Sequence, residues 1–229
     1  MSRFALVYTY YDNPAMLERQ VENWNQFPAE VQDIASVIVV DDGSPKHPAL
    51  PLMQRCRIPK TLFRVDVDIR WHQHPARNIG AHEAGEDDVW LFCSDIDIVL
   101  PPDAALAMVR KELNPRYYYS FARVFAPQML SRKIHHNTFL VRRGVYWEVG
   151  GYDEDYVGTY CSESPFLRQL AAIAPHEHFA DIVTIGHPAV NTAAGPRDES
   201  GYMELFERKC RNGDERARNP LRNSWTRLL

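Results

Sequence analysis

The chain has 229 residues, of which 45% are hydrophobic, and its formal net charge is -4. This length can bury one substantial core, and the acidic balance argues against nucleic acid as a partner. Four scattered cysteines without a C-x-x-C pair disfavour a zinc site or a disulfide framework and favour a reducing, cytoplasmic location. We expect no signal peptide and no membrane anchor, because no stretch reaches the roughly 20 apolar residues of a membrane span.

The first half of the chain alternates between predicted strands and helices. Bulky and β-branched runs predict the strands, and apolar residues at helical spacing predict the helices. In chain order we expect a strand at 4–10, a helix opening at Asn13-Pro14, a strand at 34–40 and a short helix at 48–55, then a strand at 61–67, a helix at 74–85, a strand at 89–93 and a helix at 104–113. This alternation predicts a mostly parallel, doubly wound sheet.

The second half changes in character. We expect strands at 117–124 and 137–142 that are antiparallel or at an edge, a short helix at 144–149, a helix at 164–174 and a strand at 182–185. Residues 191–201 are rich in Gly, Pro, Ala and Ser and predict a loop. The tail from Arg208 onward holds seven basic residues and two acids, which favours a solvated face. A contact of this tail with an anionic lipid surface, as a peripheral membrane protein, is the alternative.

Two carboxylates, Asp95 and Asp97, follow the apolar run at 89–93 and precede a proline pair. A buried strand that ends in Asp-x-Asp delivers acids to the edge of the sheet where ligands of open α/β proteins bind. Two nearby carboxylates are costly unless they meet a cation, and oxygen ligands suit Mg²⁺ or Mn²⁺. A solvated strand end or a helix cap before Pro101 is the plainer alternative.

Three further polar clusters follow predicted strands or lie in loops: residues 9–12, residues 41–44 and the region around Glu163. Because the carboxyl ends of parallel strands meet at one crevice, we expect these clusters to converge there. Each cluster has a plainer interpretation alone; residues 41–44, for example, also read as a simple turn.

With these clusters the chain resembles the family 2 glycosyltransferases of the GT-A fold, from about Phe4 to about His187. The landmarks are VYTYYDNP, VIVVDDGSP, HPARNIGAHEAGEDDVWLFCSDIDIVLPP and VGGYDEDYVGTYCSESPFLRQL. The resemblance implies an α/β fold of the GT-A type, with a Rossmann-like, mostly parallel sheet flanked by helices and a smaller mixed sheet on the acceptor side. It implies one domain over residues 1–229, with a nucleotide-binding half at about 1–100 and an acceptor-binding half, ending in a helical tail, at about 101–229.

The resemblance also implies nucleotide-binding residues. Thr9 and Tyr11 occupy positions that touch the base, and one of Asp41 and Asp42 hydrogen-bonds the base or ribose. Arg77 matches an arginine that approaches the base or the diphosphate. An ion pair of Arg77 with a nearby glutamate of its own helix region is the alternative.

The same resemblance implies a metal site. Asp95 lies near the ribose and the metal, Asp97 ligates the metal directly, and His187 completes the metal shell. Mn²⁺, or Mg²⁺, is the implied cofactor, and Mn²⁺ tolerates a mixed set of oxygen and imidazole ligands. His72, His74, His135 and His136 show no ligand spacing and are expected to be surface or structural residues.

The implied catalytic base is Glu163. The family places an acidic pair before a helix, and here only one acid, Glu163, precedes the predicted helix at 164–174. An alternative alignment puts Ser164 at the base position, but a serine is a poor base for a hydroxyl. Capping of the helix is the alternative role for Glu163, and Asp153 and Asp155 are the next candidates for the base.

The resemblance implies a metal-dependent, inverting glycosyltransferase that moves a sugar from a nucleotide-diphosphate sugar, with UDP-sugar favoured, to a hydroxyl of a glycan or glycolipid. The alternatives are a non-catalytic nucleotide-sugar binding protein, favoured by the missing second acid, and a sugar nucleotidyltransferase. The latter class has a Gly-rich, basic loop after its first strand, where this chain has TYYDNPAM. We further expect the loop at 191–201 to close over the donor, with Arg197 reaching the diphosphate.

Overall fold

A computed structural model describes residues 4–69, 72–160, 163–187, 200–214 and 216–229. Its strands are β1 (Phe4–Tyr10), β2 (Ala35–Asp41), β3 (Lys60–Val65), β4 (Trp90–Asp95), β5 (Ile98–Val99), β6 (Tyr118–Phe125), β7 (Leu130–Arg132), β8 (Phe139–Arg142), β9 (His176–Gly186) and β10 (Trp225–Arg227). Its helices are α1 (Pro14–Trp24), α2 (Ala29–Gln32), α3 (Leu50–Met53), α4 (Gln73–Glu83), α5 (Pro102–Val109), α6 (Arg143–Glu148), the 3₁₀ turn η1 (Glu154–Tyr156), α7 (Ser164–Ile173) and α8 (Ser200–Arg211).

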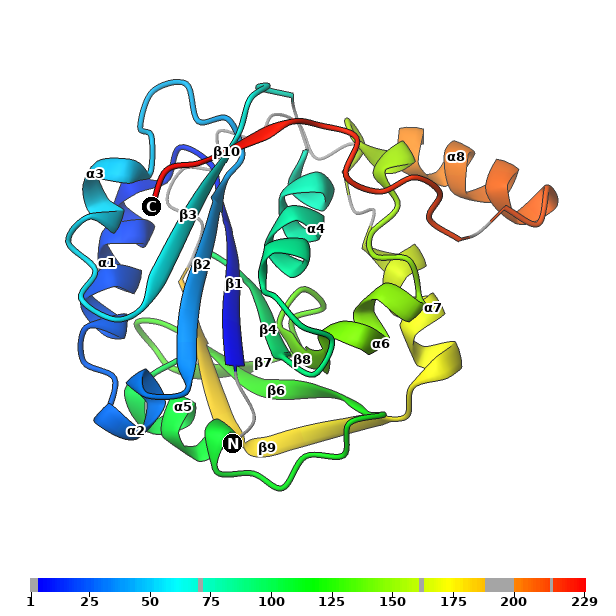
Figure 1. Cartoon of the computed structure of the whole chain (residues 1–229). Helices are drawn as coiled ribbons and strands as arrows, with labels where there is room; N and C mark the ends of the chain where they lie inside the picture. Colours follow the sequence, from blue (N-terminus) through cyan, green and yellow to red (C-terminus); the bar gives the residue numbers. More distant parts are fainter. Residues whose placement is uncertain (1–3, 70–71, 161–162, 188–199, 215) are drawn as a thin grey trace.

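The described strands form one sheet in the order β10-β3-β2-β1-β4-β8-β6-β9-β5, with β7 paired to β6 (Figure 1). Strands β3, β2, β1 and β4 are parallel, as their alternation with helices predicts. The register sets Tyr10 beside Asp41 and Thr9 beside Asp95. The predicted polar clusters at the ends of β1, β2 and β4 therefore lie at one edge of the sheet.

The other half of the sheet is mixed and continues from β4 without a break. Strand β8 pairs antiparallel with β4 and with β6, which confirms the antiparallel prediction for these two segments and places both inside the sheet instead of at its edge. Strand β9 pairs with β6 and is longer than predicted. Its first residues are His-Glu-His and largely exposed, so they carry no apolar pattern that marks a strand.

Helices cover both faces of the sheet, α1 and α3 on one and α4, α6 and α7 on the other (Figure 1). Side chains of β1 alternate between the two cores: Leu6 packs with the α1 residue Leu17, and Val7 packs with the α4 residue Ile79. Helix α4 approaches β1 so closely that a Cβ at Gly80 would lie 2.3 Å from Val7 Cγ1. The site at the strand ends thus rests on a rigid two-sided core.

The C-terminal part differs from the predicted helical tail. After α8 the chain turns back across the molecule and ends in β10, antiparallel to β3 (Figure 1). Trp225 Nε1 donates to Glu83 Oε1 at 2.9 Å and Asp66 N donates to Ser224 O at 3.1 Å, so this segment is bound to the sheet and is not simply a solvated face. We call residues 216–229 the C-terminal strap.

Two further predictions concern the segment before α8 and membrane contact. The predicted loop at 191–201, with Arg197, lies outside the described residues up to position 199, and its last two residues begin α8. Among the helices that the structure describes, none has the length and apolar character needed to cross a bilayer.

Candidate functional site

Asp41 and Asp42 follow β2 and have different environments. Asp41 is fully buried: its Oδ1 accepts from Ser44 N, and its Oδ2 accepts from Ala49 N, each at 2.9 Å. Arg64 Nη1 also donates to Oδ2 at 3.2 Å. These bonds occupy both carboxylate oxygens in holding the loop after β2. In the structure Asp41 therefore serves to hold the loop.

Gly43 fixes the path of this loop. Its φ of 76° lies in the region that side chains disfavour, and a Cβ there would lie 2.3 Å from Val67 O. The segment at 67–68 is thus pressed against the loop, and Tyr11 Oη donates to Asp68 Oδ1 at 2.9 Å. Tyr11 therefore lies between the end of β1 and the segment after β3, on the same edge as Asp42.

Asp42 is part of a buried chain of polar groups that reaches the C-terminal strap. His72 Nδ1 lies 2.7 Å from Asp42 Oδ1, and Asn223 Nδ2 lies 2.9 Å from His72 Nε2. Because the Asn223 amide donates to Nε2, the proton of a neutral imidazole is on Nδ1 and is donated to Asp42. Burial raises the pKa of the Asp42 carboxyl above its ordinary value. His72, expected to be a surface or structural residue, is buried and contacts Asp42 directly.

Arg77 lies on α4 and pairs with Asp95 at the end of β4, and not with a glutamate near its own helix. The Nη2–Oδ1 distance is 2.5 Å, and the guanidinium also lies 5.1 Å from the centre of the Tyr152 ring. Burial alone would raise the pKa of the Asp95 carboxyl, but the charge of Arg77, with smaller contributions from His135 and Asn137, holds it below its ordinary value. Asp95 is therefore a fixed negative charge at the centre of the site.

Glu163 immediately precedes α7, but its side chain does not cap that helix. Its Oε1 accepts from Gln73 Nε2 and from Asn137 Nδ2, each at 3.1 Å. The same Asn137 nitrogen donates to Asp95 Oδ2 at 3.1 Å. The structure thus brings Glu163 and Asp95, far apart in the chain, to either side of one amide.

Asp97 and His187 also meet. The turn after β4 and the end of β9 are joined by a hydrogen bond from His187 N to Asp97 O at 2.9 Å. Burial lowers the pKa of the His187 imidazole, which favours the neutral form that binds metals. Among the described residues, no three His, Cys, Asp or Glu side chains are grouped to hold a metal ion.

The other candidates for the base are already engaged in ion pairs. Lys209 of α8, buried with Asp153, has its Nζ 2.8 Å from Asp153 Oδ2 and 2.6 Å from Asp155 Oδ2. Arg222 Nη1 of the C-terminal strap pairs with the other oxygen of Asp155 at 2.5 Å. These bonds direct both aspartates towards α8 and the strap, which leaves Glu163 as the acid beside Asp95.

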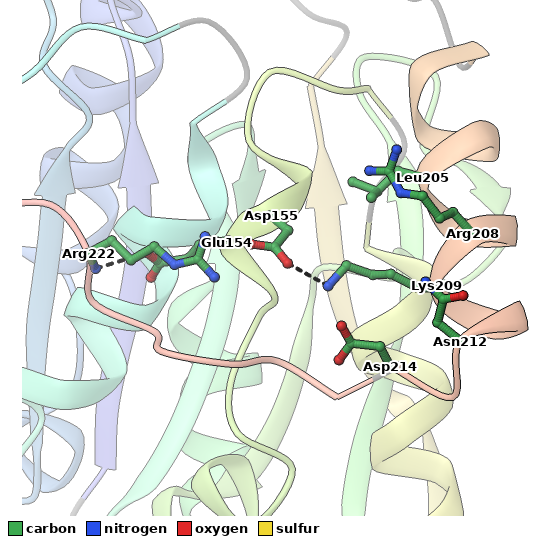
Figure 2. A pocket seen from close by; sticks show the side chains of 8 residues that line it. All are labelled: Glu154, Asp155, Leu205, Arg208, Lys209, Asn212, Asp214 and Arg222. Carbon is green, nitrogen blue, oxygen red and sulfur yellow. Dashed lines mark hydrogen bonds and ion pairs between the residues drawn. The ribbon is translucent and has the colours of Figure 1, made fainter.

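A polar cavity of about 460 Å³ lies among these ion pairs, between η1, α8 and the C-terminal strap (Figure 2). Its wall includes Glu154, whose Oε1 accepts from Asn78 Nδ2 and Leu221 N and whose Oε2 accepts from Arg222 N. Figure 2 shows Lys209 reaching across it to Asp155. Most of the charged side chains in the cavity wall pair with one another. These ion pairs and hydrogen bonds attach α8 and the C-terminal strap to the segment that precedes Glu163.

Residues 9–173 match the model of a protein family described as glycosyl transferase family 2. The chain belongs to this family. No curated protein sequence matches the chain.

Solved structures resemble this family 2 chain in fold. They include the mannosyltransferase PcManGT from Pyrobaculum calidifontis in complex with GDP-Man and Mn²⁺, with a TM-score of 0.62 and 17% identity over 90% of this chain and 60% of that one. S. aureus TarS 1-349 in complex with UDP-GlcNAc has a TM-score of 0.63 and 12% identity over 83% of this chain and 60% of that one. The chain therefore spans about 60% of the length of these structures, and their similarity confirms the predicted GT-A fold.

Four residues of the site were missed by the sequence reasoning or seen only as structural: His72, Gln73, His135 and Asn137. His135 Nε2 lies 3.6 Å from Asp95 Oδ2, and burial lowers the pKa of its imidazole. No local pattern marks these residues, because their partners lie on other elements. Their only signal in the sequence is their position. His72 and Gln73 precede the landmark HPARNIG, and His135 and Asn137 lie just before and at the start of the predicted strand at 137–142.

Proposed function

We propose that the protein is a metal-dependent, inverting glycosyltransferase. It moves a sugar from a nucleotide-diphosphate sugar to a hydroxyl of a glycan or glycolipid acceptor. The observation that carries this proposal is the placement of Asp95 and Glu163 on either side of Asn137, with Arg77 beside them, at the edge of the sheet where Asp42 also lies. UDP-sugar is the favoured donor, and a GDP-sugar is the second choice.

Asp42, Thr9 and Tyr11 are the proposed contacts of the nucleoside. Asp42 Oδ1 already accepts from His72, and we propose that its second oxygen accepts from the base or ribose. The ionised Asp95 and the cation Arg77 then lie beyond the nucleoside, where the ribose ends and the diphosphate begins. A guanidinium suits diphosphate oxygens because it presents several donors in one plane.

The residues present fit a divalent metal. Asp97 and His187 are joined by a backbone hydrogen bond, and a carboxylate with an imidazole is a donor set that Mn²⁺ accepts. Since Asp95 is paired with Arg77 and no three such side chains are grouped among the described residues, Asp97 and His187 would hold the ion from one side, and diphosphate oxygens and water would complete its shell. Such an ion neutralises the charge that develops on the leaving nucleoside diphosphate.

Glu163 is the proposed general base. It takes the proton from the acceptor hydroxyl as the hydroxyl oxygen forms a bond to the anomeric carbon, and the bond from that carbon to the diphosphate oxygen breaks. Attack on the face opposite the leaving group inverts the configuration. Of the described residues, Gln73 and Asn137 donate their amides to one oxygen of Glu163, and we propose that the other oxygen meets the hydroxyl.

Thermal unfolding with nucleotides tests this function. We expect UDP or UDP-sugar, or else the GDP or dTDP equivalents, to raise the melting temperature by about 5–10 °C at a hundredfold excess over Kd, and only with Mn²⁺ or Mg²⁺ present. Asp97→Asn, as the matched variant, should lose the metal-dependent part of the shift. If none of these nucleotides changes the melting temperature in either condition, the proposed donor site is wrong. Release of nucleoside diphosphate from the sugar donor then separates an enzyme from a non-catalytic binder.

The C-terminal strap gives a second prediction for the donor site. Asn223→Ala removes the donor to His72 Nε2, so the tautomer and orientation of the His72 ring are no longer fixed and Asp42 loses a stable partner. We expect nucleotide affinity to fall by about 3- to 10-fold, as for the loss of one hydrogen bond. Titration calorimetry measures the affinity, and Ser224→Ala, an exposed neighbour on the same strap, is the control. Equal affinities of the two variants would contradict the role given to His72.

A further inference from the structure

Asn137 occupies the space between the two carboxylates of the site. It precedes β8 and is 8% exposed. Its Nδ2 is 3.1 Å from Asp95 Oδ2 and 3.1 Å from Glu163 Oε1, so a single NH₂ group bridges an acid from β4 and the acid that precedes α7. An amide nitrogen has two hydrogens, and each carboxylate takes one.

The orientation of this amide follows from its neighbours. An ionised carboxylate only accepts hydrogen bonds, so the group that faces both acids is the NH₂ and not the carbonyl. The carbonyl Oδ1 therefore points away from both acids, and it is buried without a hydrogen-bond partner among the described residues. A buried acceptor left unpaired is costly, and a hydroxyl of a bound ligand would satisfy it.

The charges around Asn137 explain why a neutral bridge is needed. Asp95 is balanced by Arg77 from α4, whose guanidinium also lies over the Tyr152 ring, and His135 approaches the same Asp95 oxygen that Asn137 binds. Among the residues that the structure describes, the hydrogen-bond donors to Glu163 are neutral amides, from Gln73 and Asn137. Without Asn137, Glu163 would keep one donor and would be free to turn away from Asp95.

We propose that Asn137 is the positioning residue of the reaction: its amide fixes Glu163 relative to Asp95 and hence relative to the anomeric carbon. This inference rests on the proposed function and deepens it, because it explains how a lone acid can serve at this position. The NH₂ of Asn137 sets the separation of the two acids.

A double-mutant cycle tests the proposal. The assay is the release of nucleoside diphosphate from a UDP- or GDP-sugar with Mn²⁺, for the parent, Asn137→Ala, Glu163→Gln and the double variant. We expect Asn137→Ala to lower turnover by about 10- to 100-fold, with donor affinity within about twofold of the parent. In the Glu163→Gln background, Asn137→Ala should lower turnover by less than about twofold further, because the residue acts through Glu163.

Two further variants separate positioning from folding. Asn137→Asp keeps the shape of the side chain but replaces the donor with an acceptor, and it should lose at least as much turnover as Asn137→Ala. Ser120→Ala is the matched control: Ser120 is also buried, lies on the neighbouring strand β6, and binds His176 and His178 away from the site acids. Melting temperatures report folding, and if Asn137→Ala does not fold, Asn137→Asp alone decides.

Three results would overturn the proposal. If the parent is active and Asn137→Ala or Asn137→Asp turns over at the parental rate, this inference is wrong and the proposed function stands. An equal fall in turnover in both backgrounds shows that Asn137 acts independently of Glu163 and also removes it. A parent that releases no nucleoside diphosphate from any nucleotide sugar removes the proposed function, and this inference with it.

Discussion

Replacing Glu163 with Gln is expected to lower turnover by about 10²- to 10⁴-fold, the range of a lost general base. The glutamine keeps the size of the side chain and can still bind the Gln73 and Asn137 amides through its carbonyl oxygen, so the local structure should survive. Donor affinity should stay near that of the parent, because the proposed partner of Glu163 is the acceptor hydroxyl and not the donor. Steady-state kinetics with the donor identified by thermal shift measures the split between turnover and affinity.

Asp155→Asn is the matched control for this experiment. Asp155 is the nearest rival acid along the chain, but both of its oxygens pair with Lys209 and Arg222. We therefore expect this variant to keep most of its turnover and to lose stability. A Glu163→Gln protein that transfers sugar at the parental rate, beside an inactive Asp155→Asn protein, would reverse the assignment of the base.

Replacing Arg77 with Met is expected to destabilise the fold by about 3 kcal/mol and to abolish turnover. The Arg77 side chain is 3% exposed and the Asp95 side chain 26%, so the substitution leaves a largely buried carboxylate without its cation. Urea unfolding monitored by circular dichroism measures the free energy of unfolding. Adding Asp95→Asn to this variant should recover part of the stability, because the unpaired charge is then removed, but it should not recover turnover.

An exposed ion pair provides the control for Arg77. Arg110 binds Glu30 through two hydrogen bonds, yet both side chains are about half exposed, at 59% and 48%. Solvent screens such pairs, so Arg110→Met should unfold close to the parental denaturant concentration. If Arg77→Met and Arg110→Met unfold at the same denaturant concentration, burial does not make the Arg77–Asp95 pair more important for stability than the exposed pair.

The parallel half of the fold is predictable because its physical causes are local. Strand β2 is an apolar, β-branched run bounded by turn residues. Helix α1 begins at Pro14 and is capped by Asn13, whose Oδ1 accepts from Met16 N at 3.3 Å. Such signals also predict that the acids after β1, β2 and β4 share an edge of the sheet. The single-domain prediction for residues 1–229, with its division near residue 100, stays a prediction.

The amide and imidazole groups of the site were not predictable in the same way. The partners of Asn137 are Asp95 and Glu163, at separations of 42 and 26 residues, and nothing near Asn137 in the chain signals either contact. Asp41 and Asp42 are adjacent and chemically identical, so the sequence does not distinguish their roles. In the structure Asp41 differs from Asp42 because backbone amides of the loop bind both of its carboxylate oxygens. Likewise β10 has three residues, too few for a period to be visible.

The C-terminal strap has a consequence for how this protein folds during synthesis. The Asn223–His72 and Thr226–Asp66 hydrogen bonds join residues 151 and 160 positions apart, so they cannot form until all the intervening residues have been made. Contacts of such long sequence separation form slowly because a large loop must close first. Until then, β3 presents an open backbone edge on the nascent polypeptide, which its pairing with β10 later covers.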